Sequence, residues 1–104
     1  MNNEPKYGLL EADLIAIIAK LKKNDRINKI ILFGSRAKET HNQGSDIDIA
    51  IEGTKLTSKD LVDASIELDT LFLPYKFDLI IINRIKEQAL IEHISRVGVV
   101  LYDA

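Results

Sequence analysis

Three aspartates are the residues of this chain whose spacing most directly suggests chemistry. Asp46 and Asp48 are two positions apart in a segment that alternates polar and apolar residues. Residues i and i+2 of a strand share one face and lie about 6.6–7 Å apart, so both carboxylates would project to the same side. They would repel each other unless a cation lay between them. The alternative interpretation is an edge strand with a solvated polar face.

The third aspartate, Asp78, interrupts an apolar segment that runs from Phe77 to Ile82. A carboxylate among core-facing residues is costly unless it is neutralised, paired or bound to metal. If its strand lies about 4.8 Å from the strand of Asp46 and Asp48, all three carboxylates meet on one face. Such a cluster would suit Mg²⁺, which accepts oxygen ligands from carboxylates, water and phosphate. Asp78 could instead stand at the exposed start of its strand.

A glycine–serine pair, Gly34 and Ser35, follows the apolar residues 30–33. Glycine lets backbone N–H groups approach an anion, and a helical turn beginning at Ser35 would direct its dipole toward a phosphate. Arg36 or Lys38 could add positive charge. Such a pair usually marks only a turn. Because it precedes Asp46 by eleven residues, it here indicates a nucleotide site, which needs both phosphate donors and a metal.

The two histidines offer no comparable pattern. His41 lies in a polar segment and His93 on the last expected helix, and neither has a partner at metal-ligand spacing. We therefore expect a solvated side chain for His41 and a surface or boundary position for His93.

Apolar residues at helical spacing predict three helices around this site. The first runs from about Leu9 to Lys23, and the second begins at Thr57 or Ser58 and ends before Pro74. The third covers about Ile85 to Arg96, with Gly98 as its C′ residue. The residues expected to face the core are Leu10, Leu14, Ile17 and Leu21 in the first helix, and Ile85, Ala89, Leu90, Ile94 and Val97 in the third.

Four strands are expected between these helices, at residues 27–33, 46–52, 77–82 and 99–102. The first is apolar on both faces, which is typical of a central strand covered on each side. Residues 35–44 are predicted to form a loop or a short helical turn. The order α-β-β-α-β-α-β favours an α+β or α/β domain, in which helices flank a mixed sheet of three to four strands.

Composition limits the remaining possibilities. The 104 residues are 46% hydrophobic, which is typical of one compact domain, here residues 1–104. The chain has no cysteine, which excludes a disulfide scaffold and fits a cytoplasmic protein. A net charge of −2 argues against binding nucleic acid through bulk positive charge. No apolar run approaches the ~18–20 residues of a membrane helix, and we see no secretory signal.

The combined motifs resemble those of a known family. Residues 34–38 (GSRAK), 44–50 (GSDIDIA) and 77–80 (FDLI) resemble the nucleotidyltransferase signature Gly-Ser-x-Ala-x-Gly followed by Ser-Asp-x-Asp and a third Asp on a later strand. The short length and the ending GVVLY at residues 98–102 are similar to the minimal nucleotidyltransferases, the MNT proteins. Glu39 departs from the pattern, since it stands where the family usually has its second glycine.

The resemblance implies a polymerase-beta-like core that transfers a nucleotide, releasing pyrophosphate from a nucleoside triphosphate such as ATP. Asp46, Asp48 and Asp78 would then be catalytic and hold two Mg²⁺ ions, with Asp78 helping to activate the acceptor hydroxyl. Gly34 and Ser35 would bind the β- and γ-phosphates. Arg36 and Lys38 would neutralise charge on the leaving group.

The resemblance also implies a partner. In the MNT family this is typically a HEPN protein, a small helical ribonuclease toxin, and the MNT protein acts as antitoxin by adenylylating a tyrosine of the toxin. The alternative is a non-catalytic module that neutralises the toxin by contact, which Glu39 favours. Direct contact with nucleic acid or membrane is not expected, and self-association into a homo-oligomer is left open.

Overall fold

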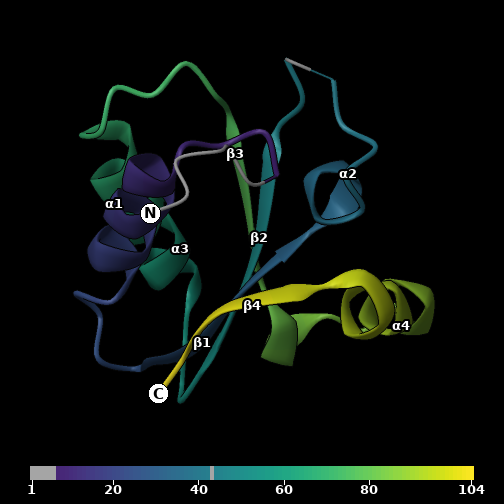
Figure 1. Cartoon of the computed structure of the whole chain (residues 1–104). Helices are drawn as coiled ribbons and strands as arrows, with labels where there is room; N and C mark the ends of the chain where they lie inside the picture. Colours follow the sequence, from purple (N-terminus) through teal and green to yellow (C-terminus); the bar gives the residue numbers. More distant parts are fainter. Residues whose placement is uncertain (1–6, 43) are drawn as a thin grey trace.

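A four-stranded mixed sheet forms the centre of the fold (Figure 1). The computed structural model describes residues 7–42 and 44–104. The sheet order is β3-β2-β1-β4, where β1 pairs antiparallel with both β2 and β4, and β2 pairs parallel with β3. The predicted α+β class and mixed sheet are confirmed. The strands are β1 (Ile27–Phe33), β2 (Ile47–Gly53), β3 (Phe77–Ile81) and β4 (Val99–Asp103).

The helices lie on both sides of this sheet. Helices α1 (Glu11–Leu21) and α3 (Ser58–Asp69) lie together on one side, and α4 (Gln88–Val97) lies on the other, near the short α2 (Gly34–Ala37) (Figure 1). A 3₁₀ turn, η1 (Ile82–Arg84), follows β3. No helix within the described residues is long and apolar enough to cross a membrane.

Alternation along β2 decides which side of the sheet carries the acidic residues. Ile47, Ile49 and Ile51 are fully buried in the larger core cluster, together with residues of α1 and α3. Ala50 belongs instead to the smaller cluster, which includes Ile94 of α4. Because successive side chains of a strand point to opposite faces, Asp48 shares the face of Ala50. The predicted site therefore lies on the α2–α4 side of the sheet.

The ends of two helices differ from the prediction. Leu10 was expected in the core but is 55% exposed, because α1 begins only at Glu11 and Leu10 precedes its first turn. Leu9 is fully buried in its place. The last helix begins at Gln88 rather than near Ile85, because the backbone is extended at Ile85 and at Glu87, and Ala89 is exposed.

Gly98 follows α4 as expected but not in the conformation expected of a C′ glycine. Its φ of −63° and ψ of 143° are extended rather than left-handed. A Cβ atom at this position would overlap the carbonyl oxygen of Ile94 and would lie 2.7 Å from Cγ2 of Ile31. The glycine is thus required by the close packing of the α4–β4 junction against β1.

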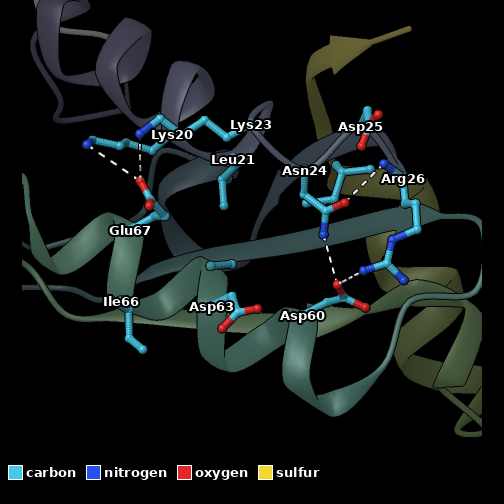
Figure 2. A pocket seen from close by; sticks show the side chains of 12 residues that line it. Lys20, Leu21, Lys23, Asn24, Asp25, Arg26, Asp60, Asp63, Ile66 and Glu67 are labelled. Atoms are coloured by element: carbon cyan, nitrogen blue, oxygen red, sulfur yellow. Dashed lines mark hydrogen bonds and ion pairs between the residues drawn. The ribbon is translucent and has the colours of Figure 1, made fainter.

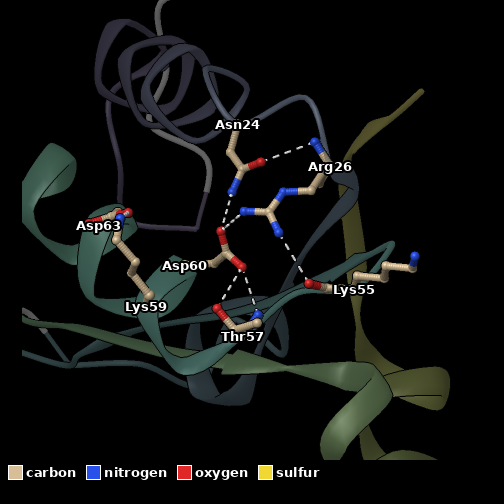
Figure 3. A network of polar contacts seen from close by, with 7 residues as sticks. All are labelled: Asn24, Arg26, Lys55, Thr57, Lys59, Asp60 and Asp63. Atoms are coloured by element: carbon tan, nitrogen blue, oxygen red, sulfur yellow. Dashed lines mark hydrogen bonds and ion pairs between the residues drawn. The ribbon is translucent and has the colours of Figure 1, made fainter.

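A buried carboxylate joins the start of α3 to the turn before β1 (Figure 3). Asp60 is 3% exposed and accepts hydrogen bonds from the Thr57 N–H at 2.7 Å and from Asn24 Nδ2 at 2.9 Å. It also forms an ion pair with Arg26. The Thr57 N–H is the main reason that the pKa of Asp60 lies below its ordinary value. This carboxylate therefore stabilises the fold in its ionised form.

We expect Asp60→Asn to lower the melting temperature by several degrees at neutral pH, because the amide cannot replace an anion with this set of donors. A carboxyl whose pKa is lowered by folding stabilises the protein above its unfolded pKa, and this contribution is lost as the pH falls through the folded value. The difference between the two proteins should therefore disappear in acid. Thermal unfolding followed by circular dichroism over a pH series measures it.

Asp63→Asn is the matched control, because Asp63 lies one turn further along α3, is exposed, and pairs only with Lys59 among the ion pairs of residues 7–42 and 44–104. An exposed i,i+4 pair contributes little, so this variant should melt close to the wild type. Equal melting temperatures for the Asp60 and Asp63 variants would contradict the prediction.

Candidate active site

The sheet brings two of the three predicted carboxylates side by side. Asp48, the second residue of β2, is paired in register with Asp78 of β3 on one side and with Phe33 of β1 on the other. Residues paired across neighbouring strands point to the same face. Asp46 lies just before β2, two residues from Asp48, and is exposed. Asp78 is the second residue of β3 and is exposed, as the alternative interpretation expected, yet it also lies beside Asp48.

The electrostatics of Asp48 reflect these neighbours. Burial raises the pKa of the Asp48 carboxyl above its ordinary value, and the carboxylates of Asp78 and Asp46 raise it further. Arg36 and His93 act on this pKa in the opposite direction. A carboxyl whose ionised form is destabilised by burial and by like charges is typical of a functional site. A bound cation would relieve the repulsion between the carboxylates.

The donor set matches magnesium in chemistry, although the carboxylates do not converge on one point. Carboxylate oxygens are the ligands that Mg²⁺ prefers. Within the described residues, however, no three His, Asp or Glu side chains lie close enough together to hold a metal ion as they stand. The structure thus places Asp48 beside Asp78 and keeps Asp46 adjacent.

Gly34 is fixed by two independent constraints. Its φ is +75°, in the left-handed region that favours glycine. A Cβ at this position would also overlap Oδ2 of Asp48, so the Asp48 carboxylate packs directly against the Gly34 backbone. Ser35 follows in α2 and is partly buried, and Lys38 at the end of the turn is exposed. The Gly34–Ser35 turn therefore lies directly beside the pair formed by Asp48 and Asp78.

Arg36 does not occupy the position that the sequence predicts. Its side chain is 1% exposed, and its guanidinium donates to the carbonyl oxygens of Ser45 and Tyr7. A phosphate contact was expected, but the group is directed into the protein because these carbonyls surround it. Lys38 is the other cation of the predicted pair, and it is exposed.

Glu39 takes a conformation that explains the glycine of the signature. Its φ is +60°. The Glu39 N–H donates to the Arg36 carbonyl at 3.1 Å, and the Thr40 N–H donates to the Ser35 carbonyl at 2.9 Å. These two bonds after α2 form a Schellman motif, in which the residue in the Glu39 position is usually glycine. The departure from the signature therefore leaves the backbone of the loop in its glycine-like conformation.

We expect Glu39→Gly to raise the free energy of unfolding by up to about 1 kcal/mol relative to Glu39→Ala, because only glycine avoids the left-handed penalty of an L-residue. The alanine variant is the matched control, since it also removes the exposed carboxylate but keeps the backbone strain. Urea unfolding of both variants measures the difference. If the two variants are equally stable, the assignment of strain to this residue is wrong.

His93 lies at the boundary position that the sequence predicts, whereas His41 is less exposed than expected. His93 of α4 is partly buried, and its ring packs edge-to-face on Phe33, with centroids 6.5 Å apart. His41 was expected to be solvated, yet its Nδ1 atom is buried without a hydrogen-bond partner in the part of the chain that the structure describes. Gly8 packs closely against this ring, because a Cβ at that position would overlap Nε2 of His41.

Two hollows lie away from this cluster. One, of about 490 Å³, lies between α1 and α3, where Lys20 and Lys23 form ion pairs with Glu67 (Figure 2). The other, of about 350 Å³, lies between α4 and the sheet and is lined mainly by isoleucines. Neither is lined by a residue of the predicted site.

Comparison with known proteins supports the fold described above. The family model described as polymerase beta, nucleotidyltransferase, matches residues 16–104. No curated protein matches the chain in sequence. A crystal structure of a toxin–antitoxin with AMP-PNP has a TM-score of 0.75 and 25% identity, and the match covers 88% of this chain and 73% of that one.

Two further solved structures show the same fold. A mutant toxin–antitoxin MntA-HpeT has a TM-score of 0.70 and 28% identity, covering 85% of this chain and 70% of that one. A tri-AMPylated Shewanella oneidensis HEPN toxin in complex with MNT antitoxin has a TM-score of 0.70 and 22% identity, covering 90% and 72%.

Proposed function

The chain belongs to the polymerase beta nucleotidyltransferase family, and we propose that it is an antitoxin that transfers AMP from ATP, with Mg²⁺, to a hydroxyl group of a HEPN toxin. The observation that carries this proposal is the register of Asp48 with Asp78 beside the Gly34–Ser35 turn. Phosphate donors and metal-binding carboxylates are thereby adjacent, as nucleotide transfer requires. Because the reaction consumes ATP, we place the protein in the cytoplasm.

In the proposed reaction, Asp46, Asp48 and Asp78 would hold Mg²⁺. Bound magnesium would stabilise the attacking and leaving oxygens of an in-line displacement. The Ser35 hydroxyl and the backbone of Gly34 bind the β- and γ-phosphates, and exposed Lys38 neutralises the leaving pyrophosphate.

The acceptor oxygen forms a bond to the α-phosphorus as the bond from that atom to the pyrophosphate oxygen breaks. Asp78 is exposed on an edge strand, where it can accept the acceptor's proton and pass it to solvent. The open side of this strand also gives access to a hydroxyl carried by another protein.

The partner is proposed from similarity. The three solved structures described above are toxin–antitoxin structures, and in one of them the HEPN toxin is AMPylated. A tyrosine hydroxyl of such a toxin is the acceptor we propose for this chain.

Transfer of label from ATP tests the proposal. The chain is mixed with Mg²⁺, with a purified HEPN toxin, and with ATP labelled on either the α- or the γ-phosphate. Label should reach the toxin from the α-position only and should be lost when the metal is chelated. Mass spectrometry should then locate AMP on a tyrosine.

The Asp46→Asn/Asp48→Asn double variant separates the enzyme from a protein that acts by contact. It should bind the toxin but neither label it nor suppress its ribonuclease activity. If the double variant neutralises the toxin as well as the wild type does, and no label is transferred by either, the proposed function is wrong and neutralisation by contact is correct.

A further inference from the structure

Arg36 is the largest of the fully buried side chains in the described residues. A guanidinium remains protonated in proteins, and burying a charge is costly unless its donors are satisfied. No ion pair of residues 7–42 and 44–104 includes Arg36, so its partners are neutral groups. Its charge acts on the Asp48 carboxylate only from beyond ion-pair distance. The direct contacts of the guanidinium therefore show what it does in the structure, through the segments that they join.

The guanidinium joins three segments that are distant in sequence. Its Nε and Nη2 atoms both donate to the carbonyl oxygen of Ser45, at 3.2 and 2.8 Å. Its Nη1 atom donates to the carbonyl oxygen of Tyr7 at 2.9 Å. Its plane lies against the ring of Tyr75, with Cζ 4.8 Å from the ring centroid. Its nitrogen atoms and one of its planar faces are therefore in contact with three different parts of the chain.

Two of these segments lead directly into the strands of the carboxylates. The Ser45 carbonyl belongs to the peptide bond that precedes Asp46, and Tyr75 lies three residues before Asp78. The same two segments are joined to each other by the Ile47 N–H, which donates to the Lys76 carbonyl at 2.8 Å. Arg36 therefore supports the point at which β2 and β3 begin to pair.

We infer that Arg36 is a positioning residue that sets the spacing of the Asp46, Asp48 and Asp78 carboxylates for a divalent cation, by holding the segments that enter β2 and β3. The inference rests on the proposed function, because it assigns a metal to these carboxylates. Arg36 itself touches neither the metal nor the nucleotide.

A direct phosphate contact makes a different prediction. Lysine can supply a positive charge at a phosphate, whereas the contacts of Arg36 need a planar guanidinium that donates to two carbonyls and stacks on a ring. Arg36→Lys keeps the charge and loses the planar guanidinium. It should therefore weaken metal binding and lower kcat, with a smaller change in KM for ATP.

The experiment measures binding of Mn²⁺ alone by titration calorimetry, with circular dichroism to verify folding. Arg36→Lys should bind Mn²⁺ about 10–100-fold more weakly than the wild type, the usual cost of removing an outer contact from a metal site. Lys86→Gln is the control, since it removes an exposed cation that has no part in the proposed site, and its Mn²⁺ affinity should not fall.

Variants of Tyr75 provide a second test, which does not depend on whether the Arg36→Lys protein folds. Tyr75→Leu removes the stacking surface and should weaken Mn²⁺ binding in the same direction, and Tyr75→Phe should not. If the wild type binds Mn²⁺ and a folded Arg36→Lys binds it equally well, or Tyr75→Leu behaves as Tyr75→Phe, the inference is wrong and the proposed function stands. If the wild type binds no Mn²⁺, both are wrong.

Discussion

Replacing Asp48 with asparagine is expected to abolish nucleotide transfer and to make the metal-free protein more resistant to heat. Asp48 is held between Phe33 and Asp78 and packs on Gly34, so it is the carboxylate closest to the centre of the site. Loss of a metal ligand removes several kcal/mol of transition-state stabilisation, and transfer should fall by about 10³-fold or more. Label transfer from α-labelled ATP measures this loss.

The gain in stability follows from the raised pKa of Asp48. Burial, followed by the neighbouring carboxylates, disfavours the ionised form in the folded protein. A carboxyl whose pKa is raised by folding opposes folding at pH values above its folded pKa, and the penalty disappears below the unfolded value. Asp48→Asn should therefore melt higher than the wild type at neutral pH, and the difference should vanish in acid.

Added Mg²⁺ should reverse the order, because it stabilises only the protein that binds it. Asp25→Asn is the control, since Asp25 is exposed in the turn before β1, at the end of that strand remote from Phe33. This variant should follow the wild type with and without metal. Lower stability of metal-free Asp48→Asn at neutral pH would mean that the carboxylate is a structural group, and a metal role would then lose its main electrostatic support.

Local patterns were sufficient to predict the strands and the position of the acidic pair. The alternation of Ile47, Ile49 and Ile51 with polar residues places Asp48 on the opposite face whatever the rest of the chain does. The apolar segment around Asp78 likewise predicted a strand, and the parallel pairing of β2 with β3 brings the two carboxylates together. The faces follow from strand geometry alone, whereas the pairing of the two strands was only a condition of the prediction and comes from the structure.

The position of Arg36 could not be predicted in this way. An arginine in a polar segment is ordinarily exposed, and its burial here depends on the carbonyls of Tyr7 and Ser45 and on the ring of Tyr75. Those partners come from three places in the sequence. The contact of His93 with Phe33 was not predicted for the same reason, because it arises from the packing of α4 on the sheet. Long-range contacts of polar groups leave no periodic signal.

The backbone conformations of single residues could not be predicted from the sequence pattern either. Glu39 has the left-handed φ that the signature glycine would take. Gly98 has an extended conformation, although its place after a helix suggested a left-handed one. In each case the backbone follows the contacts around it: the Schellman hydrogen bonds at Glu39, and the carbonyl of Ile94 at Gly98. Residue type alone predicts such conformations poorly.

Gly34→Ala is expected to damage both the fold and the reaction. The left-handed φ of Gly34 costs an L-residue about 1–2 kcal/mol, and the added methyl group would in addition overlap the Asp48 carboxylate. The carboxylate must move to relieve this overlap, and a displacement of about 1 Å at a reacting centre lowers the rate by about 10²-fold. Urea unfolding and label transfer measure the two effects.

Gly44→Ala is the matched control, because a Cβ at Gly44 would meet no heavy atom of residues 7–42 and 44–104 within 4 Å. It should leave stability and transfer close to the wild-type values. If Gly44→Ala and Gly34→Ala lose equal stability, the close approach of Gly34 to Asp48 is not a constraint on the fold.

A double-mutant cycle separates the strain of the backbone from the overlap with the carboxylate. Asp48→Ala removes the atoms that the new methyl group would meet, so Gly34→Ala should cost less stability in that background than in the wild type. The cost that remains is the left-handed penalty alone. Additive effects of the two substitutions would show that Gly34 and Asp48 do not press on each other, whereas a coupling of about 1 kcal/mol or more establishes that the phosphate-binding turn and the carboxylate pair are built as one unit.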